Sequence, residues 1–268
     1  MRIISLNAWG GAMFNEFARW LDTCDDADVL CLQEVTHTPT AGGWTRFDDA
    51  ERSLPQRADL LADVRLRLPR HHGLFSASDS GPVYDHERRA HRQDFGLATF
   101  VSRTLTPVGM RAAFVHGDYA EHHDRWPSEG RPRAALAVRV FDRQVGRFVT
   151  VVNFHGLRDA SGKADTPARR AQAERLADFV ADAREKGDLT VVCGDFNVLP
   201  DSETFRILAG LELVDLVRDA DTRTSRYRKP LRHASYLLVS ESAAVERFEI
   251  VTTPEVSDHR PLLLDLRL

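Results

Sequence analysis

Four short apolar segments of this sequence run directly into polar side chains. They are RIISLNAWG, VLCLQEV, VTVVNFHG and LTVVCGDFN. Apolar and β-branched runs of this length are typical of buried strands, so each polar group is predicted to lie where a strand ends. In α/β proteins, the loops that follow strands at one end of a sheet supply the groups that bind ligands. The pattern therefore predicts an α/β fold with its functional residues gathered at one edge.

Helices are predicted between these strands from the spacing of apolar residues. One covers residues 14–21, a second covers 53–69 with Ser53 as its N-cap, and a third covers 166–187 with Thr166 as its cap. Further strands are predicted at residues 96–101, 134–140, 147–154, 189–193, 235–240, 247–251 and 261–266. This number of strands exceeds what one doubly wound sheet needs.

Two polar stretches, residues 76–94 and 116–133, contain glycine or proline and are predicted to be loops long enough for a functional role. No repeat and no obvious linker divides the chain. The 268 residues are therefore expected to form a single domain, residues 1–268, although two tightly packed halves are also compatible with this length.

Composition excludes several classes of protein. A formal net charge of −4 argues against a generally basic nucleic-acid binder, so any polyanion must be met by a local basic patch. The three cysteines are too few and too widely spaced for a disulfide framework or a zinc cluster. No apolar run approaches the ~18 residues of a transmembrane helix. A cytoplasmic protein is predicted, with the presence of a leader in the natural chain left open.

A fifth segment, VSDHRPLLLDL, places Asp258 and His259 just before a strand, which suits an antiparallel strand that begins at the same edge. The five segments together supply carboxylates, amides and imidazoles. Oxygen ligands without a cysteine and histidine set suit magnesium or manganese rather than structural zinc.

In this order, the segments resemble the motifs of the endonuclease/exonuclease/phosphatase superfamily, which includes exonuclease III, pancreatic deoxyribonuclease, inositol polyphosphate 5-phosphatases and bacterial sphingomyelinases. The resemblance runs from SLNAWG through LQEV, NFHG and GDFN to SDHRPL. It implies a four-layer α/β sandwich, in which two mixed β-sheets pack face to face and are flanked by helices. The site is then expected at the rim of the sandwich.

The resemblance also implies roles for the polar residues. Glu34 is the expected principal ligand of Mg²⁺ or Mn²⁺, with help from Asn7 and Asp258. Asp195 is expected to orient and deprotonate the attacking water, and Asn197 to position that water or to donate to a phosphate oxygen.

Further roles follow for the histidines and their neighbours. His259 and His155 are expected to bond the non-bridging oxygens as negative charge grows. Asn153 is expected to brace the loop that carries His155. Asp94, in RQDFGLATF, lies where several relatives carry a carboxylate that pairs with the first histidine, so it is the expected partner of His155; a solvated loop acid is the alternative.

Two basic segments are candidates for substrate binding. Arg131 and Arg133, in GRPRAAL, precede a strand where members of the superfamily often contact phosphate, a task that suits the guanidinium fork. Arg226 and Tyr227 belong to a basic cluster that suits a phosphate backbone with a base stacked on the ring. Its other members are Arg223, Arg228, Lys229 and Arg232. A solvated basic loop is the alternative.

The function predicted is a divalent-metal-dependent phosphoester hydrolase that cleaves phosphodiesters in nucleic acid by attack of an activated water. One alternative is a phosphatase or phosphodiesterase for a small phosphorylated metabolite or a lipid head group. Another is a catalytically weakened member that binds a phosphorylated ligand or a partner protein. The oligomeric state is left open, with a monomer favoured.

The sequence departs from the superfamily pattern at one position. Many members have an Asp in a segment resembling Arg-Ile-Asp-Tyr-Ile, where it bonds the far nitrogen of the catalytic histidine. Here the segment is RHASYLLVS, so Ser235 is the expected partner of His259. A hydroxyl cannot stabilise a protonated imidazole as a carboxylate does, so His259 is predicted to lose its proton more easily unless another acid replaces the missing one.

Overall fold

Two β-sheets packed face to face form the centre of the protein. The computed structural model describes residues 1–268. Sheet A contains, in spatial order, β14 (Val245–Ile250), β15 (Leu262–Leu266), β1 (Arg2–Asn7), β2 (Val29–His37), β6 (Ala90–Ser102), β5 (His71–Tyr84), β3 (Trp44–Asp48) and β4 (Ser53–Arg57), with β8 (Ala120–Glu121) beside β5. Sheet B contains β12 (Val214–Asp215), β13 (Ser235–Val239), β11 (Leu189–Asp195), β10 (Arg147–His155), β9 (Arg133–Asp142) and β7 (Thr106–His116). Both sheets mix parallel and antiparallel neighbours.

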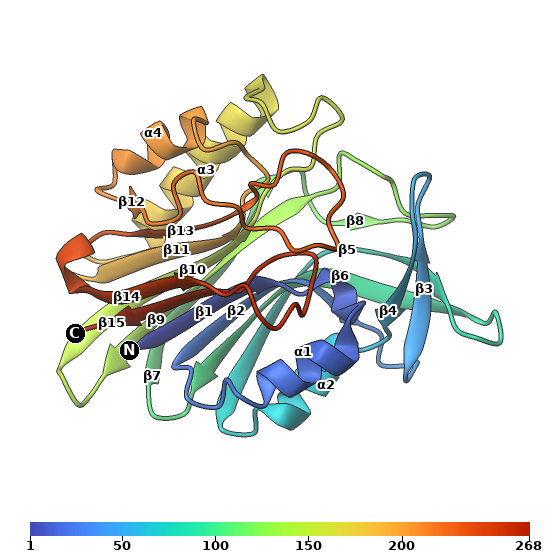
Figure 1. Ribbon diagram of the computed structural model, residues 1–268, viewed down its shortest axis with the longest axis horizontal. Coiled ribbons are helices and arrows are strands. Elements are labelled where there is room, and N and C mark those ends of the chain that lie inside the picture. Colours follow the sequence, from blue (N-terminus) through green and yellow to red (C-terminus); the bar gives the residue numbers. More distant parts are fainter.

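Helices cover the outer faces of the two sheets (Figure 1). Helices α1 (Phe14–Leu21) and α2 (Leu60–Arg67) lie on sheet A, and α3 (Pro167–Ala183) and α4 (Glu203–Ala209) lie on sheet B. Two short 3₁₀ turns, η1 (Trp9–Gly11) and η2 (Ser242–Ala244), complete the elements. The predicted four-layer α/β sandwich is confirmed. None of the helices has the length and apolar character needed to cross a lipid bilayer.

The strand register brings the polar ends of the predicted strands together. Strands β10 and β11 are parallel, and His155 lies opposite Asp195. This close pairing requires glycine at two positions: a Cβ at Gly156 would lie 2.2 Å from the Phe196 carbonyl oxygen, and one at Gly194 would lie 1.9 Å from that of Phe154. The glycines of the NFHG and GDFN motifs therefore allow the two backbones to meet where the functional side chains begin.

A buried cluster of polar contacts around Asn153 joins the two sheets. The Gln33 amide of β2 donates to Asn153 Oδ1 of β10 at 2.7 Å. The Asn153 amide in turn donates to the carbonyl oxygens of Leu32 and Ala98, at 3.1 and 3.0 Å. Both side chains are fully buried. Asn153 therefore braces sheet B against sheet A, rather than the loop that follows it.

The structure corrects the predicted helix over 53–69. Residues Ser53–Arg57 form β4, which pairs with β3 as a hairpin, and the helix begins only after the N-cap Asp59. The Asp49 carboxylate accepts the backbone N–H groups of Glu51 and Arg52 and so stabilises the hairpin turn. Pro55 lies on an edge strand, where its missing N–H leaves no ladder bond unmade.

The predicted loop over residues 76–94 is also wrong. Most of this stretch belongs to the long antiparallel pair of β5 and β6. Its polar residues resemble a loop in the sequence, but Ser78, Asp79 and Ser80 are buried in the sheet. Residues 116–133, by contrast, form mostly irregular structure with the short β8. The third helix begins after Thr166, whose side chain accepts the Arg169 N–H, and ends at Ala183, four residues before Gly187.

Replacing Asn153 with Ala should destabilise the protein by about 2–4 kcal/mol, because the buried Gln33 amide is left without its acceptor. Urea unfolding of the variant measures this. Replacing both Gln33 and Asn153 with Leu should recover part of the loss, because the Gln33 amide is then no longer buried without its acceptor. A loss below about 0.5 kcal/mol for Asn153→Ala would show that this contact does not hold the sheets together.

Candidate active site

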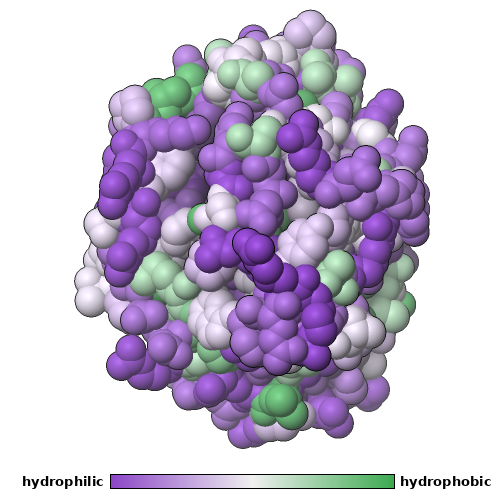
Figure 2. Space-filling model, turned by 90° about the vertical axis from the view of Figure 1, so that its right-hand side faces the viewer, coloured by the Kyte–Doolittle hydropathy of each residue, from purple (hydrophilic) through white to green (hydrophobic).

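A cavity of about 550 Å³ opens where β1, β2, β10 and β11 end. Its walls are the β3–β4 hairpin on one side and residues 222–233, here called the basic loop, on the other. Figure 2 views the protein from the side that carries the hairpin and shows a mostly hydrophilic face with small, scattered hydrophobic patches. Arg158 ties the hairpin to the neighbouring segment by bonding Glu51 at 2.5 Å and the Ser128 carbonyl at 2.9 Å.

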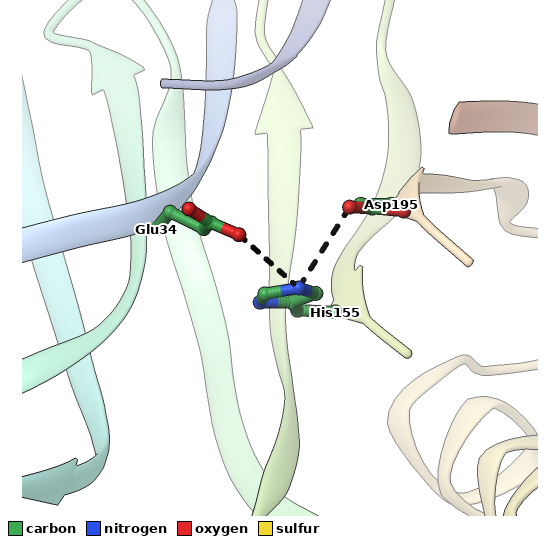
Figure 3. Close-up of side chains that lie close together, drawn as sticks. All are labelled: Glu34, His155 and Asp195. Atoms are coloured by element: carbon green, nitrogen blue, oxygen red, sulfur yellow. Dashed lines mark ion pairs between the residues drawn. The ribbon is translucent and has the colours of Figure 1, made fainter. Parts of the chain in front are cut away.

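Three side chains at the floor of the cavity form a compact set of possible metal ligands. One ligand atom each of Glu34, His155 and Asp195 lies within 4.8 Å of the others. The two carboxylates point towards the imidazole from opposite sides, at 3.9 and 3.8 Å from Nε2 (Figure 3). Glu34 lies in a bulge of β2, has a positive φ of 55°, and accepts no hydrogen bond. A carboxylate without a donor suits a divalent cation, so Glu34 is the member of this set that fits a metal best.

The other two expected metal ligands are engaged elsewhere. The Asn7 oxygen accepts the Trp9 N–H at 2.9 Å, and its amide donates to Asp195 at 3.0 Å. Asp258 binds Arg223 at 2.6 Å. Burial raises the pKa of Asp258 to about 6, against the opposing effect of Arg223. Asn7 is therefore occupied by hydrogen bonds at both ends of its amide, whereas Asp258 binds Arg223 through one oxygen only.

Asp195 is at the centre of the polar contacts and is 2% exposed. One oxygen accepts the Asn7 amide and lies 3.4 Å from His259 Nε2, and the other accepts the Asn197 N–H at 3.1 Å. Burial raises the pKa of this carboxyl, and the charges of Arg223 and Lys163 oppose the rise. A buried carboxylate with a raised pKa is suited to accept a proton near neutral pH.

The structure places Ser235 where the sequence predicts the partner of His259. Ser235 Oγ and His259 Nδ1 lie 2.8 Å apart. Burial, followed by the charge of Arg223, holds the pKa of His259 well below its usual range. A hydroxyl can donate to Nδ1 of a neutral ring, which leaves the proton on Nε2, the nitrogen that faces Asp195. Ser235 thus favours a neutral histidine that donates from Nε2.

His155 has no acidic partner of the expected kind. Asp94 lies on β6, opposite Ser80 and His37, and forms no hydrogen bond or ion pair with His155. The carboxylates near His155 are those of Glu34 and Asp195. Burial and then the charge of Arg133 hold the pKa of His155 well below its usual range.

Arg131 and Arg133 both line the cavity but differ in their contacts. The Arg131 guanidinium donates two hydrogen bonds to the buried Asp79 carboxylate, at 2.7 and 2.9 Å, and stacks on Phe95 and Trp126. Arg133 is 5% exposed and has no hydrogen-bond partner at Nε or Nη1. Burial and then the charge of Arg131 lower the pKa of Arg133 to about 10. Arg133 is therefore the guanidinium that remains free for an anion.

The basic loop presents its cations at the mouth of the cavity. Arg226 is exposed and lines the cavity. Tyr227 lies deeper, with the Arg223 guanidinium 4.1 Å and the Lys163 ammonium 5.5 Å from the ring centre. One face of this ring is thus already used by a cation. Asn197, with a positive φ of 56°, gives its amide to the Gly156 carbonyl at 3.3 Å.

Two residues of the site are absent from the predicted set. Asp79 was not predicted because it lies in a polar stretch that resembles a loop. In the structure it binds both Arg131 and His122. Lys163, in SGKADTP before α3, is a single charged residue in a polar loop, and no sequence pattern around it indicates a functional role. Only the folded chain brings it to the cavity.

The family model for the endonuclease/exonuclease/phosphatase family matches residues 4–259. The chain belongs to this family. The match includes every segment that carries the cavity floor, from Asn7 to His259. No curated protein sequence matches the chain.

Solved structures of other family members have the same fold. The chain is similar to a Bacteroides thetaiotaomicron mannosyl-6-phosphatase at 15% identity, with all of both chains covered and a TM-score of 0.68. It is similar to the human nocturnin catalytic domain with bound sulfate at 19% identity, covering 100% of this chain and 93% of that one, with a TM-score of 0.64. It is also similar to D. rerio TDP2 complexed with a single-strand DNA product, at 13% identity. This match covers 100% of this chain and 99% of that one, with a TM-score of 0.65. At these identities the likeness establishes the fold alone.

Replacing Ser235 with Asp should raise the pKa of His259, because a carboxylate beside Nδ1 stabilises the imidazolium form. If activity depends on protonated His259, the alkaline limb of the pH–rate profile should also move upward. A histidine-resolved NMR titration of both proteins, beside their pH–rate profiles, measures the two effects. An unchanged titration would contradict the pairing, and a shifted titration with an unchanged profile would show that this proton does not limit the rate.

Proposed function

We propose that this member of the family is a divalent-metal-dependent phosphoester hydrolase that attacks phosphorus with an activated water. The observation that carries the proposal is the arrangement at the cavity floor, where a carboxylate without a donor, Glu34, lies beside a buried carboxylate with a raised pKa, Asp195. One group is suited to hold a cation and the other to accept a proton. A cation bound there, Mg²⁺ or Mn²⁺, would polarise the phosphoester as a Lewis acid.

Asp195 serves as the base in this proposal. It is held from two directions by Asn7 and by the Asn197 N–H, so its oxygens are oriented before substrate arrives. Its raised pKa brings the carboxyl closer to the working pH, which favours transfer of a proton from water. The Asn197 side chain follows Asp195 at the same cavity and helps to position that water.

His259 and His155 stabilise the charge that develops on the phosphate oxygens. Both imidazoles are buried and favour the neutral form, so each contributes one N–H as a donor rather than a full positive charge. Arg133 supplies the positive charge instead. Its guanidinium has no hydrogen-bond partner at Nε or Nη1, and its pKa responds to the charges of Glu34 and Asp195. Arg131 positions the wall of the cavity through Asp79 and does not need to contact the substrate.

Nucleic-acid phosphodiesters are the substrates that we favour, with single strands ahead of duplexes. The exposed cations of the basic loop suit a phosphate backbone. The hairpin and the basic loop line the cavity on two sides, and we infer from this enclosure that a flexible single strand enters more easily than a stiff duplex. The same enclosure is the observation that supports the second candidate, a phosphatase or phosphodiesterase for a small phosphorylated molecule.

The proposal is tested by incubating the protein with Mg²⁺ or Mn²⁺ and a panel of substrates. The panel contains single-stranded DNA, duplex DNA, RNA, bis-p-nitrophenyl phosphate and sugar phosphates. Metal-dependent release of product from at least one of them is expected, and the ranking identifies the substrate class. A protein that binds a phosphorylated ligand but releases no product from any of them would favour the alternative of a catalytically weakened member.

Glu34→Gln should keep the fold and raise the Mg²⁺ concentration needed for half-maximal activity by more than about 100-fold, since even the hydrogen-bond partners of metal ligands cost about 10–100-fold when changed. The metal-induced rise in melting temperature should shrink in parallel. Glu16→Gln, at a half-buried position of α1 that does not line the cavity, is the matched control. Wild-type activity of Glu34→Gln at low Mg²⁺ would show that Glu34 is not the ligand.

Asp195→Asn and His259→Ala should each slow turnover by about 10²–10⁴-fold, because proton transfer and charge stabilisation are each worth that much. The two side chains lie 3.4 Å apart and act on one transition state, so the double variant should lose far less than the product of the single losses. Steady-state kinetics of the four proteins gives the comparison. Losses that simply multiply would mean that the two residues act in separate steps.

A further inference from the structure

Lys163 is a buried cation without a carboxylate partner. It lies between β10 and α3 and is 9% exposed. Its ammonium donates to the His233 carbonyl, and no Asp or Glu oxygen lies within 4.0 Å. Desolvating an ammonium is costly unless an anion compensates it, and a neutral carbonyl compensates it only in part.

The pKa of Lys163 supports this account. Burial and then the charge of Arg223 lower it to about 8, although Asp195 and Asp258 act in the opposite direction. Lys163 is therefore still mostly protonated at neutral pH. A bound anion would relieve an electrostatic deficit that the chain does not relieve by itself.

The surroundings of Lys163 are cationic as well. Arg226, Arg228 and Lys229 of the basic loop line the same cavity, are exposed, and form no ion pair. Arg223 is different, because its guanidinium is bound to Asp258. This end of the cavity thus has one buried and three exposed cations that are free.

Lys163 contacts the basic loop, since its ammonium donates to the His233 carbonyl and lies 5.5 Å from the Tyr227 ring centre. Arg133 begins β9 two residues after Arg131, whose guanidinium lies 5.8 Å from the ring centre of Phe47 in the β3–β4 hairpin. The phosphate that reacts must lie between the two histidines, where Arg133 is available. Lys163 is therefore in place for a second anionic group of the same substrate.

We propose that Lys163 and the cations of the basic loop form a second phosphate subsite, so that the preferred substrate carries another phosphate near the one that reacts. The proposal rests on the phosphoester hydrolase function argued above. Two sources have this chemistry: the next phosphate of a single strand of nucleic acid, and a phosphomonoester on a small molecule.

Binding tests the subsite without catalysis. Isothermal titration of the protein with pyrophosphate and with orthophosphate should show tighter binding of pyrophosphate, by about 10–100-fold, the range that a hydrogen bond to a charged group supports. Lys163→Met should lose most of this difference, and Lys163→Arg should restore part of it. Lys186→Met, an exposed lysine outside the cavity, is the matched control and should keep the difference.

Kinetics identifies the source of the second phosphate. The ratio of kcat/KM with and without an added phosphate is measured for a dinucleotide with or without a 5′-phosphate, and for a sugar bisphosphate against its monophosphate. The larger ratio marks the natural class, and Lys163→Met should bring that ratio close to one.

Several outcomes would overturn the proposal. Equal binding of pyrophosphate and orthophosphate by the wild type would do so, even if no substrate is cleaved. Equal losses on both members of a substrate pair in Lys163→Met would show that Lys163 serves the reacting phosphate or the fold. If Lys163→Met does not fold, Arg228→Ala with Lys229→Ala replaces it, and an unchanged preference for pyrophosphate would contradict the subsite. Absence of cleavage with retained preference for pyrophosphate would instead contradict the hydrolase function alone.

Discussion

The bond between Gln33 and Asn153 is the contact on which the site depends. It is the shortest of the hydrogen bonds that Asn153 makes across the interface between the two sheets, and it joins β2 of one to β10 of the other. Glu34 follows Gln33, and His155 comes two residues after Asn153. Holding these strands in one relative position therefore holds the carboxylate of one sheet against the imidazole of the other. A shift between the sheets would separate them.

The cations of the cavity differ in whether they are already bound to a carboxylate, and this difference decides which of them are available to an anionic substrate. Arg131 is bound to Asp79 and Arg223 is bound to Asp258, so neither needs a further anion. Arg133 and Lys163 are buried without a carboxylate, Arg133 near Arg131 and Lys163 beside the basic loop. The whole chain carries a net charge of −4, yet this cavity offers free positive charge. An anionic substrate is recognised locally, against the sign of the protein as a whole.

Sequence patterns predicted the elements whose signal is local. The helix after Thr166 has a cap, a proline at its first position and an apolar stripe, and it forms as predicted. The helix expected from Ser53 does not form there, because pairing with β3 outweighs the local preference. Strand β5 was missed because Asp79 and its neighbours are polar, and their burial is compensated by partners such as Arg131 that lie far away in the chain.

The sequence by itself indicated most of the polar residues of the site, because a strand that ends in a polar group places that group at the edge of its sheet. The resemblance to the superfamily also indicated that Ser235 faces His259. Only the tertiary structure decided which of these groups are free to react. Hydrogen-bond partners such as Asp79 and Arg131 lie 52 residues apart, and their pairing depends on packing rather than on spacing along the chain. For that reason the free Arg133 and Lys163 can be distinguished from paired cations only in the folded protein.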